Sequence, residues 1–210
     1  MTDRERTLAR IRTLGVVPII RADTADEARR IIDAIREGGL DLVEITMTVP
    51  GALRVIEAVV AKADGVILGA GTVLDPETAR ACLFAGASFI VSPALHLPTV
   101  ELCRRQGAVV MPGALTPTEV VAAWQAGADL VKIFPASAVG GPAYLKALAG
   151  PLPQIELVPT GGVDLKNAGD FIRAGAAAVG VGSDLTRGKR AEITEKTRRL
   201  LEAVSEARGG

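Results

Sequence analysis

Short apolar runs alternate along the chain with longer segments in which apolar side chains recur at helical spacing. The apolar runs are rich in Val and Ile and contain few polar residues, which predicts strands that are buried on both faces. Eight such strands are expected, over residues 16–21, 42–47, 66–72, 89–93, 109–115, 130–135, 155–160 and 178–183.

The intervening segments have the end signals of amphipathic helices. Several begin with Thr or Asp, which cap helix N-termini, and stop at Gly, as at residues 24–39, 75–87, 116–128 and 164–176. Buried strands that alternate with helices indicate a parallel sheet. Eight repeats in 210 residues favour a (β/α)8 TIM barrel, a single domain over residues 1–210 with an N-terminal helix. An open doubly wound sheet is the alternative.

The repeats share one internal register. Four of the expected helices end at a glycine: Gly39, Gly86, Gly127 and Gly175. The residue five positions after each glycine lies on the second, fourth, sixth and eighth expected strand, and these residues are Glu44, Val91, Lys132 and Gly180. In a (β/α)8 barrel, each interior layer takes its side chains from alternate strands. We therefore expect these four residues to share a layer, with Glu44 and Lys132 facing each other across the barrel axis.

Charge and composition narrow the choice of ligand. The 24 Lys and Arg residues balance the 24 Asp and Glu residues, so the overall charge favours a small neutral or anionic molecule over nucleic acid or an anionic membrane. The start, MTDRERTLAR, has no apolar signal segment, and no apolar run is long enough to span a bilayer. We expect a cytoplasmic protein.

Cysteine and histidine usage argues against a metal site. Cys82 and Cys103 are two isolated thiols in helical segments, which we expect to be reduced packing residues. His96 is the only histidine, so a multi-histidine metal centre is excluded and catalysis must depend on other groups.

The buried Lys132 can be interpreted in two ways. It could form a structural ion pair with Glu44, although desolvation of two charges can outweigh their attraction. Alternatively, burial favours a neutral amine, which attacks a ketone and forms an iminium. The iminium accepts the electrons of a breaking carbon–carbon bond, and the facing carboxylate of Glu44 carries the protons that the reaction needs.

Other strand ends are suited to holding a ligand. PTGGV (159–163) and VGVGSDL (179–185) follow the last two expected strands, where barrels of this fold often bind phosphate through glycine-rich turns. Arg21 ends the first expected strand, where its guanidinium could bind a carboxylate in bidentate fashion. Two further strands end in the motifs GAGTV (69–73) and VSPAL (91–95). The first supplies the hydroxyl of Thr72, and the second supplies the rigid Pro93.

Taken together and in this order, EIT, GAGTV, SP, PGALTPTE, KIFPAS, PTGGV and GVGSDL resemble the bacterial 2-keto-3-deoxy-6-phosphogluconate (KDPG) / 4-hydroxy-2-oxoglutarate aldolase family. The resemblance implies a trimeric class I aldolase of the Entner–Doudoroff pathway that uses no cofactor or metal and cleaves KDPG to pyruvate and glyceraldehyde 3-phosphate. It implies that Lys132 is the Schiff-base lysine and Glu44 the general acid/base. It also implies a substrate-binding set of Arg21, Thr72, Pro93, Phe134, Thr160, Gly161, Gly162, Gly182 and Ser183.

One position departs from the gluconate pattern. Thr48 stands where those enzymes are expected to carry an arginine, and Arg21 matches a feature of the related galactonate aldolases. The preferred epimer is therefore open, and 4-hydroxy-2-oxoglutarate, cleaved to pyruvate and glyoxylate, is a further candidate substrate. A phosphate-binding isomerase or synthase and a non-catalytic sugar-phosphate-binding barrel are the alternatives outside this family.

Overall fold

Strands and helices alternate along the chain as the hydrophobic pattern predicts. The computed structural model describes residues 1–62 and 65–209. The strands are β1 Val16–Ile20, β2 Leu42–Thr46, β3 Ile67–Gly71, β4 Phe89–Val91, β5 Val109–Met111, β6 Gly113–Ala114, β7 Val131–Ile133, β8 Leu157–Pro159 and β9 Val179–Val181. The helices are α1 Asp3–Leu14, α2 Ala25–Glu37, α3 Ala52–Val60, α4 Pro76–Phe84, α5 Leu97–Arg105, α6 Pro117–Gln125, η1 Ala136–Val139, α7 Gly141–Ala149, α8 Ala168–Arg173, α9 Ser183–Thr186 and α10 Arg190–Gly209.

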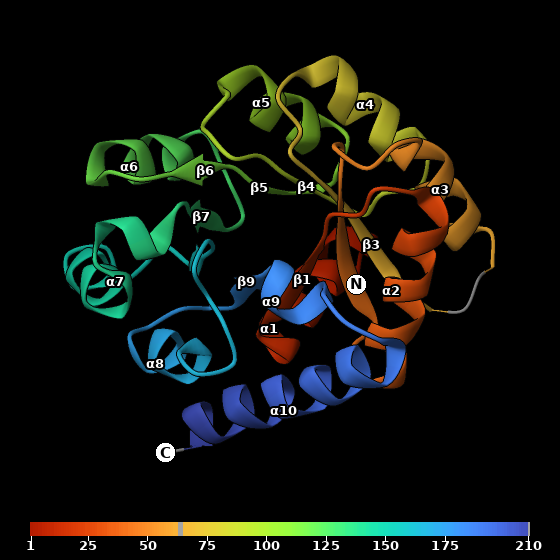
Figure 1. The fold of residues 1–210 in the computed structure, drawn as a ribbon. Helices are drawn as coiled ribbons and strands as arrows, with labels where there is room; N and C mark the ends of the chain where they lie inside the picture. Colours follow the sequence, from red (N-terminus) through yellow and green to blue (C-terminus); the bar gives the residue numbers. More distant parts are fainter. Residues whose placement is uncertain (63–64, 210) are drawn as a thin grey trace.

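The strands are parallel and form a ring with the helices outside it (Figure 1). One sheet has the order β5-β4-β3-β2-β1-β9 and the other has the order β6-β7-β8. A bridge between Thr160 and Gly180 joins β8 to β9, and β5 and β6 follow each other along the same side of the ring. The predicted (β/α)8 barrel is confirmed, and the open doubly wound sheet is not observed.

The fifth strand of the barrel is divided at Pro112. The sequence predicts one strand over residues 109–115, but Pro has no N–H group and cannot donate to a strand ladder. The carbonyl of Pro112 still accepts a hydrogen bond from the Lys132 amide at 2.9 Å, so the ring continues past the break.

Helix capping follows the sequence at most of the expected positions. The side chains of Thr24, Asp75 and Thr116 accept hydrogen bonds from the third residue of α2, α4 and α6, respectively. The helix expected from Asp164 begins later, at Ala168. Asp164 instead accepts hydrogen bonds from the Lys166 and Asn167 amides in a turn, because a short carboxylate competes for nearby backbone donors.

Strand pairing confirms the shared interior layer. Gly180 pairs with Val17, whereas Glu44 pairs with the residue two positions further along β1, Ile19. Each further pair of neighbours in this set is also offset by two residues along the strand that lies between them. The pairs are Glu44 and Val91, Val91 and Lys132, and Lys132 and Gly180. The accumulated stagger is the shear that closes an eight-stranded barrel, and it places the four residues at one height.

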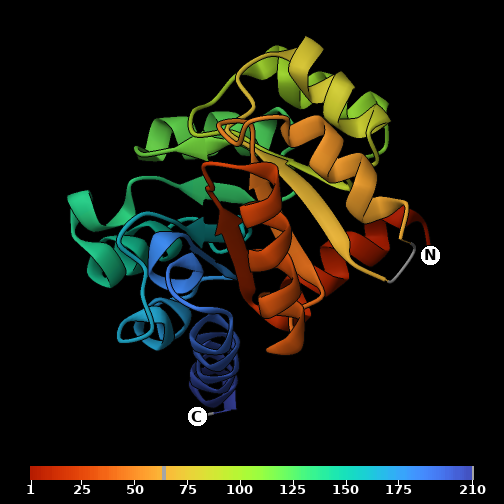
Figure 2. The same ribbon diagram turned by 45° about the vertical axis from the view of Figure 1, so that its right-hand side comes forward.

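Helix α1 crosses the amino ends of the strands. Its Arg10 Nε lies 2.8 Å from Oδ1 of Asp41, which immediately precedes β2. Arg12 Nε lies 2.8 Å from Oε1 of Glu156, which immediately precedes β8, and Arg4 pairs with Asp129 just before β7. The opposite, carboxyl ends of the strands are left free of this helix. The turned view separates the amino-terminal α1 from α10, which ends the chain (Figure 2).

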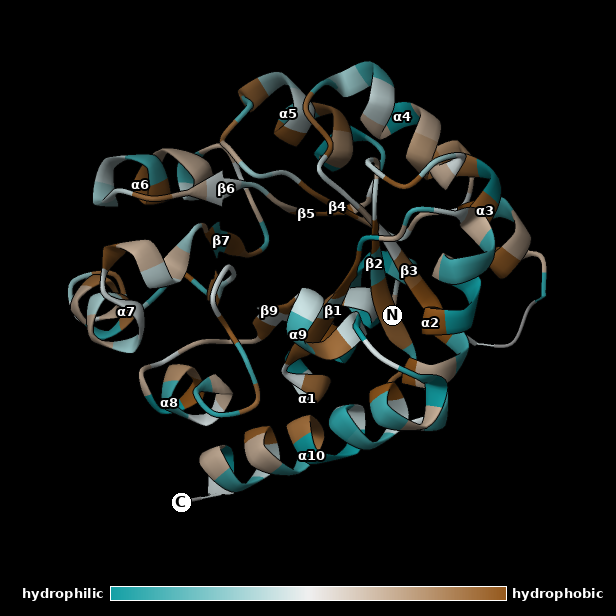
Figure 3. Ribbon diagram, viewed as in Figure 1, coloured by the Kyte–Doolittle hydropathy of each residue, from teal (hydrophilic) through white to brown (hydrophobic). Residues whose placement is uncertain are grey.

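Hydropathy follows the layers of the barrel. The central strands are predominantly hydrophobic, whereas α2 and α10 alternate hydrophobic and hydrophilic positions (Figure 3). Residues such as Ile31 and Ile35 of α2 are buried against the strands, and Asp26 and Arg36 lie on the other side of that helix. Over residues 1–62 and 65–209, no helix combines the length and apolar character needed to cross a membrane.

Candidate active site

Lys132 lies in the interior of the barrel, as the strand register predicts. It is the middle residue of β7 and is only 3% exposed, between the buried Val131 and Ile133. Its Nζ lies 5.2 Å from the centroid of the Phe134 ring, a distance at which an ammonium and an aromatic face attract each other. The amine is thus held at an apolar position near the carboxyl end of β7.

Glu44 projects into the same layer from β2, on the other side of the barrel. The residue is 2% exposed, and its Oε1 is buried without a hydrogen-bond partner among the described residues. Burial raises the pKa of the Glu44 carboxyl, and the positive charges of Lys132 and Arg21 act in the opposite direction. A buried carboxyl with a raised pKa keeps its proton to higher pH and can act as a proton donor as well as an acceptor.

The two groups do not form a structural ion pair. In the part of the chain that the structure describes, no hydrogen bond or ion pair joins Lys132 to Glu44. A buried polar atom without a partner costs free energy, and such atoms are rare in folded proteins. The arrangement therefore favours the catalytic interpretation of these residues over the structural one.

A cavity of about 340 Å³ lies at the carboxyl ends of β1, β7, β8 and β9, and it is lined by Phe134, whose ring centroid is 5.2 Å from Nζ of Lys132. It brings together seven of the nine residues predicted to bind substrate: Arg21, Phe134, Thr160, Gly161, Gly162, Gly182 and Ser183. These residues come from strand ends far apart in the sequence, and the closure of the barrel makes them neighbours.

Glycines make space for the side chains of this cavity. A Cβ atom at Gly161 would lie 3.2 Å from the Phe134 ring, so the turn after β8 packs closely on the aromatic face. A Cβ atom at Gly180 would lie 2.2 Å from Oγ1 of Thr160, so that hydroxyl occupies the space next to β9. Gly161 also has a φ of 87°, in the left-handed region that favours glycine.

Thr72 and Pro93 lie at neighbouring strand ends and do not line this cavity. Thr72 follows β3 with a φ of 59°, a left-handed conformation that is strained for a β-branched residue and typical of functional sites. Pro93 follows β4, and its carbonyl oxygen lies 2.3 Å from where a Cβ atom on Gly113 would be. Both residues border the mouth on the side of Glu44 rather than on the side of the glycine turns.

Arg21 connects two cavities. Besides the first, it lines a cavity of about 570 Å³ together with Thr48, Arg30 and Arg187. The hydroxyl oxygens of Thr48 and Thr46 lie 2.7 Å apart and share a hydrogen bond. The position at which an arginine is expected in gluconate enzymes thus lies beside Arg21, whose charge acts on Glu44.

Sequence reasoning missed three residues at the site. Asp164 and Asp184 line the cavity next to the glycine turns. Each directly follows a glycine motif, PTGGV or VGVGS, which was the available signal. Gly71 was also missed, although it lies in the quoted GAGTV motif, because the side chain that it accommodates comes from another strand.

The cysteines are packing residues, as expected. Both are buried, and burial raises the pKa of the Cys82 thiol to about 11 and that of the Cys103 thiol to about 12. His96 precedes α5 and hydrogen-bonds the Thr99 hydroxyl through Nδ1 at 2.8 Å. Among the residues that the structure describes, no group of three or more His, Cys, Asp or Glu side chains could hold a metal ion.

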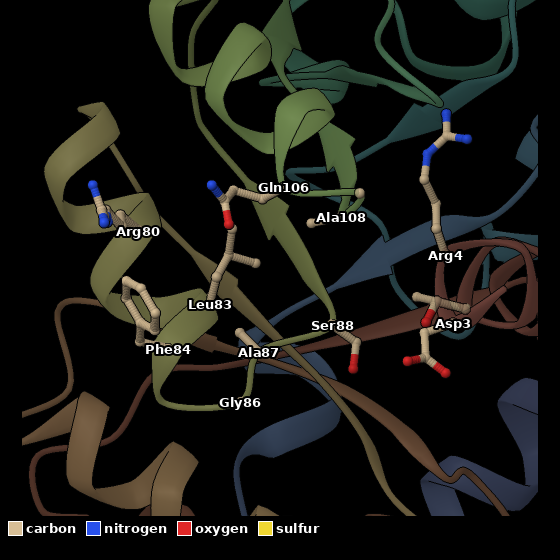
Figure 4. Close-up of a pocket in the computed structure, with 12 residues that line it drawn as sticks. Asp3, Arg4, Arg80, Leu83, Phe84, Gly86, Ala87, Ser88, Gln106 and Ala108 are labelled. Atoms are coloured by element: carbon tan, nitrogen blue, oxygen red, sulfur yellow. The ribbon is translucent and has the colours of Figure 1, made fainter.

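A separate cavity of about 380 Å³ lies at the other end of the barrel (Figure 4). Ser88 and Ala108, which line it, precede β4 and β5, so it opens at the amino ends of these strands. Its rim includes Arg80, which stacks at 5.3 Å on the exposed ring of Phe84. Active sites of this fold lie at the carboxyl ends of the strands, which Lys132 and Glu44 approach, so this cavity lies at the opposite end from the candidate site.

Comparison with known proteins agrees with this geometry. The model of the KDPG and KHG aldolase family matches residues 8–200. The chain belongs to the KDPG and KHG aldolase family. This aldolase is 40% identical over 198 residues to the 2-dehydro-3-deoxy-6-phosphogalactonate aldolase of Escherichia coli. The aligned region covers 92% of this chain and 96% of the relative.

Two further proteins extend the comparison. The 2-dehydro-3-deoxy-phosphogluconate aldolase of Pseudomonas aeruginosa is 34% identical, over 99% of both chains. A KDPG aldolase from Legionella pneumophila, solved with pyruvate captured as a covalent carbinolamine intermediate, superposes with a TM-score of 0.80. It is 27% identical, over 96% of this aldolase and 97% of that chain. The predicted family and the predicted enzyme class, a carbon–carbon lyase, are confirmed.

Proposed function

We propose that this aldolase cleaves a 2-keto-3-deoxy-6-phospho sugar acid reversibly to pyruvate and glyceraldehyde 3-phosphate, with Lys132 as the Schiff-base residue. One observation carries the proposal: a buried amine and a buried carboxyl, whose Oε1 has no hydrogen-bond partner among the described residues, project into one barrel layer from opposite strands. A structural ion pair would bring the two charges into contact, whereas a catalytic pair leaves room for substrate between them.

The reaction begins with the amine of Lys132. Its neutral form attacks C2 of the keto acid to give a carbinolamine, and loss of water gives an iminium. The Legionella pneumophila relative was solved with pyruvate at the carbinolamine stage. The Phe134 ring, whose centroid is 5.2 Å from Nζ, is proposed to cover the pyruvyl carbons and limit access of water.

Glu44 carries the protons of the following steps. As a carboxylate it removes the proton of the C4 hydroxyl, the C3–C4 bond breaks, and its electrons flow into the iminium to give an enamine. Glyceraldehyde 3-phosphate leaves with C4 as its aldehyde carbon. The protonated Glu44 then returns the proton to C3 of the enamine, and water hydrolyses the resulting pyruvyl iminium to release pyruvate and the free lysine.

The remaining predicted residues would hold the two ends of the substrate. Arg21 is proposed to bind the C1 carboxylate, with Thr72 and Pro93 bordering the pyruvyl part. Thr160, Gly161, Gly162, Gly182 and Ser183 would hold the phosphate end. They line one cavity with Arg21, which supports this assignment.

The galactonate epimer is the second candidate substrate, and two observations favour it. Thr48 and Arg21 line one cavity, which supports the proposal that Arg21 replaces the arginine that the gluconate pattern puts at position 48. The relative with 40% identity is a phosphogalactonate aldolase. The two substrates differ in configuration at C4, where the bond breaks.

The test compares kcat/KM for the two phosphorylated epimers, an unphosphorylated analogue and 4-hydroxy-2-oxoglutarate. The unphosphorylated compound is included because Asp164 and Asp184 also line this cavity, so the comparison measures how much the phosphate contributes to binding there. Pyruvate release from at least one of these substrates is expected, and it should depend on Lys132. Binding of the phosphate esters without turnover by the wild-type protein would contradict the proposed function.

We further propose that the aldolase is a cytoplasmic homotrimer of sugar-acid catabolism. Large exposed apolar side chains in and around α4 and α5 support self-association, with Leu74 60%, Phe84 77% and Leu97 53% exposed. Light scattering should give three times the chain mass, and a monomer at micromolar concentration would contradict the trimer.

A further inference from the structure

Gly71 lies where the side chain of a neighbouring strand needs space. Glu44 of β2 pairs with Gly69 of β3, and its side chain extends toward the carboxyl end of the sheet, over the next inward position of β3. A Cβ atom at Gly71 would lie 1.8 Å from Oε1 of Glu44, 2.4 Å from its Cδ and 2.7 Å from its Cγ. The carboxyl group therefore occupies the space of the missing side chain.

The backbone itself does not require glycine at this position. Gly71 is the last residue of β3, and its φ lies outside the left-handed region, so an L-residue could adopt the same conformation. Glycine in a strand costs conformational entropy and contributes no packing. What the glycine provides is room for the carboxyl of Glu44.

We propose that Gly71 is a positioning residue for the aldol reaction, because its lack of a side chain allows the Glu44 carboxyl to lie over β3 and face Lys132 across the barrel. This inference rests on the proposed function, in which Glu44 transfers the protons. No described polar group forms a hydrogen bond with Oε1 of Glu44. The space left by the missing side chain of Gly71 therefore defines the position of this oxygen.

The substitution Gly71→Ala tests this role. The added methyl displaces the carboxyl, and a displacement of about 1 Å in a reacting group can cost about 10²-fold in rate. We expect kcat for cleavage to fall about 10²-fold with KM changed less, while pyruvate and borohydride still label Lys132. The acidic limb of the pH–rate profile should move to lower pH, because a carboxyl displaced toward water loses the burial that raises its pKa.

Gly69→Ala is the matched control. Gly69 lies on the same strand and the same face and pairs with Glu44, but the atoms nearest to an added Cβ are those of the Phe89 ring, at 2.1 Å, so comparable crowding falls on Phe89 and not on the Glu44 carboxyl. Both variants should lose stability, but Gly69→Ala should keep the wild-type pH–rate profile. An equal loss of kcat with the same shift of the profile in Gly69→Ala would overturn the proposal.

A double-mutant cycle separates positioning from general damage. On a Glu44→Gln background the proton transfer is already lost, so Gly71→Ala should lower kcat further by less than about 3-fold. A further fall of about 10²-fold there, or full activity in Gly71→Ala alone, would overturn the proposal.

Folding gives an independent test. If Gly71→Ala does not accumulate as folded protein, Gly71→Ala combined with Glu44→Ala must fold as well as Glu44→Ala, because the clash is gone. Failure of that pair to fold would overturn the proposal. Absence of Lys132 labelling in the wild-type protein would instead contradict the proposed function, so the two failures are distinguishable.

Discussion

The two ends of the barrel differ in how a buried carboxyl group is hydrogen-bonded. At the amino end, Asp129 has a side chain only 3% exposed and accepts hydrogen bonds from Arg4 and from the Val110 amide. At the carboxyl end, Glu44 is equally buried, yet its Oε1 has no partner among the described residues. One carboxyl group is paired within the fold, and the other is the group that we propose to act on substrate.

This difference teaches how a structural charge can be told from a functional one. Around α1, arginines pair with carboxylates that directly precede strands, so these contacts hold the helix across the amino end. Within residues 1–62 and 65–209, Lys132 and Glu44 form no comparable ion pair, although burying them costs free energy. Substitutions at the amino end should therefore affect stability, and substitutions at the carboxyl end should affect activity.

Removal of the amine should have the largest effect. Lys132→Met keeps an apolar chain of similar length and removes the nucleophile, so cleavage should fall by more than about 10³-fold. The unfolding midpoint should stay level or rise, because a buried amine without an ion-pair partner among the described residues has been replaced by an apolar group. Steady-state kinetics and thermal unfolding measure the two effects. Substantial residual cleavage would contradict the assignment of Lys132.

Removal of the facing carboxyl should be the next largest effect. Glu44→Gln keeps the shape but cannot transfer protons, so kcat should fall about 10²–10⁴-fold, the usual contribution of general acid–base catalysis. Lys132 should still form an adduct with pyruvate, which single-turnover labelling measures. A variant with wild-type kcat would show that another group carries the protons.

At the amino end, Asp129→Ala should reduce stability without changing the chemistry. The substitution leaves the Val110 amide and Arg4 without their acceptor, at a cost of about 1–3 kcal/mol. For a chain of this size, that lowers the unfolding midpoint by about 2–12 °C. The kcat per folded molecule should match that of the wild type. A loss of kcat comparable to that of Glu44→Gln would remove the distinction between the two ends.

The raised pKa of Glu44 predicts how stability depends on pH. Because burial raises the pKa of this acid in the folded state, the folded protein holds the proton over a window in which the unfolded chain has released it. The stability from the protonated form is complete below the unfolded pKa and is lost as pH rises through the folded pKa. Glu44→Gln should remove this loss, so the variant should gain in relative stability as pH rises. Denaturant unfolding at several pH values tests it, and parallel curves would contradict it.

An exposed pair at the amino end should have the smallest effect. Arg12 and Glu156 have side chains 48% and 34% exposed, and pairs of this kind contribute about 0–1 kcal/mol. Arg12→Ala should change the free energy of unfolding by no more than that, and less at high salt. A cost as large as that of Asp129→Ala would show that exposure is not what separates the two contacts.

Most of the barrel could be predicted because its signals are local. Apolar runs gave the strands, and the spacing from helix-ending glycines placed Glu44 and Lys132 in one layer, which strand pairing confirms. Local pattern failed where a single residue interrupts an element. Pro112 divides the fifth strand, and Asp164 forms a turn before α8.

The site was less predictable because it depends on distances between strands. The sequence could not decide whether Glu44 and Lys132 touch, since barrel tilt and side-chain conformation set their separation. The role of Gly71 was equally hidden, because the atom that it accommodates belongs to β2. The roles of the eleven predicted site residues remain predictions, although seven of them line one cavity.

The most direct test is reductive trapping. The wild-type protein is incubated with pyruvate and borohydride, digested, and its peptides are weighed by mass spectrometry. We predict one reduced pyruvyl adduct, on the peptide that contains Lys132, which is absent from Lys132→Met and present in Gly69→Ala. No adduct in the wild-type protein, or an adduct on another lysine, would contradict the claim that this buried amine is the nucleophile.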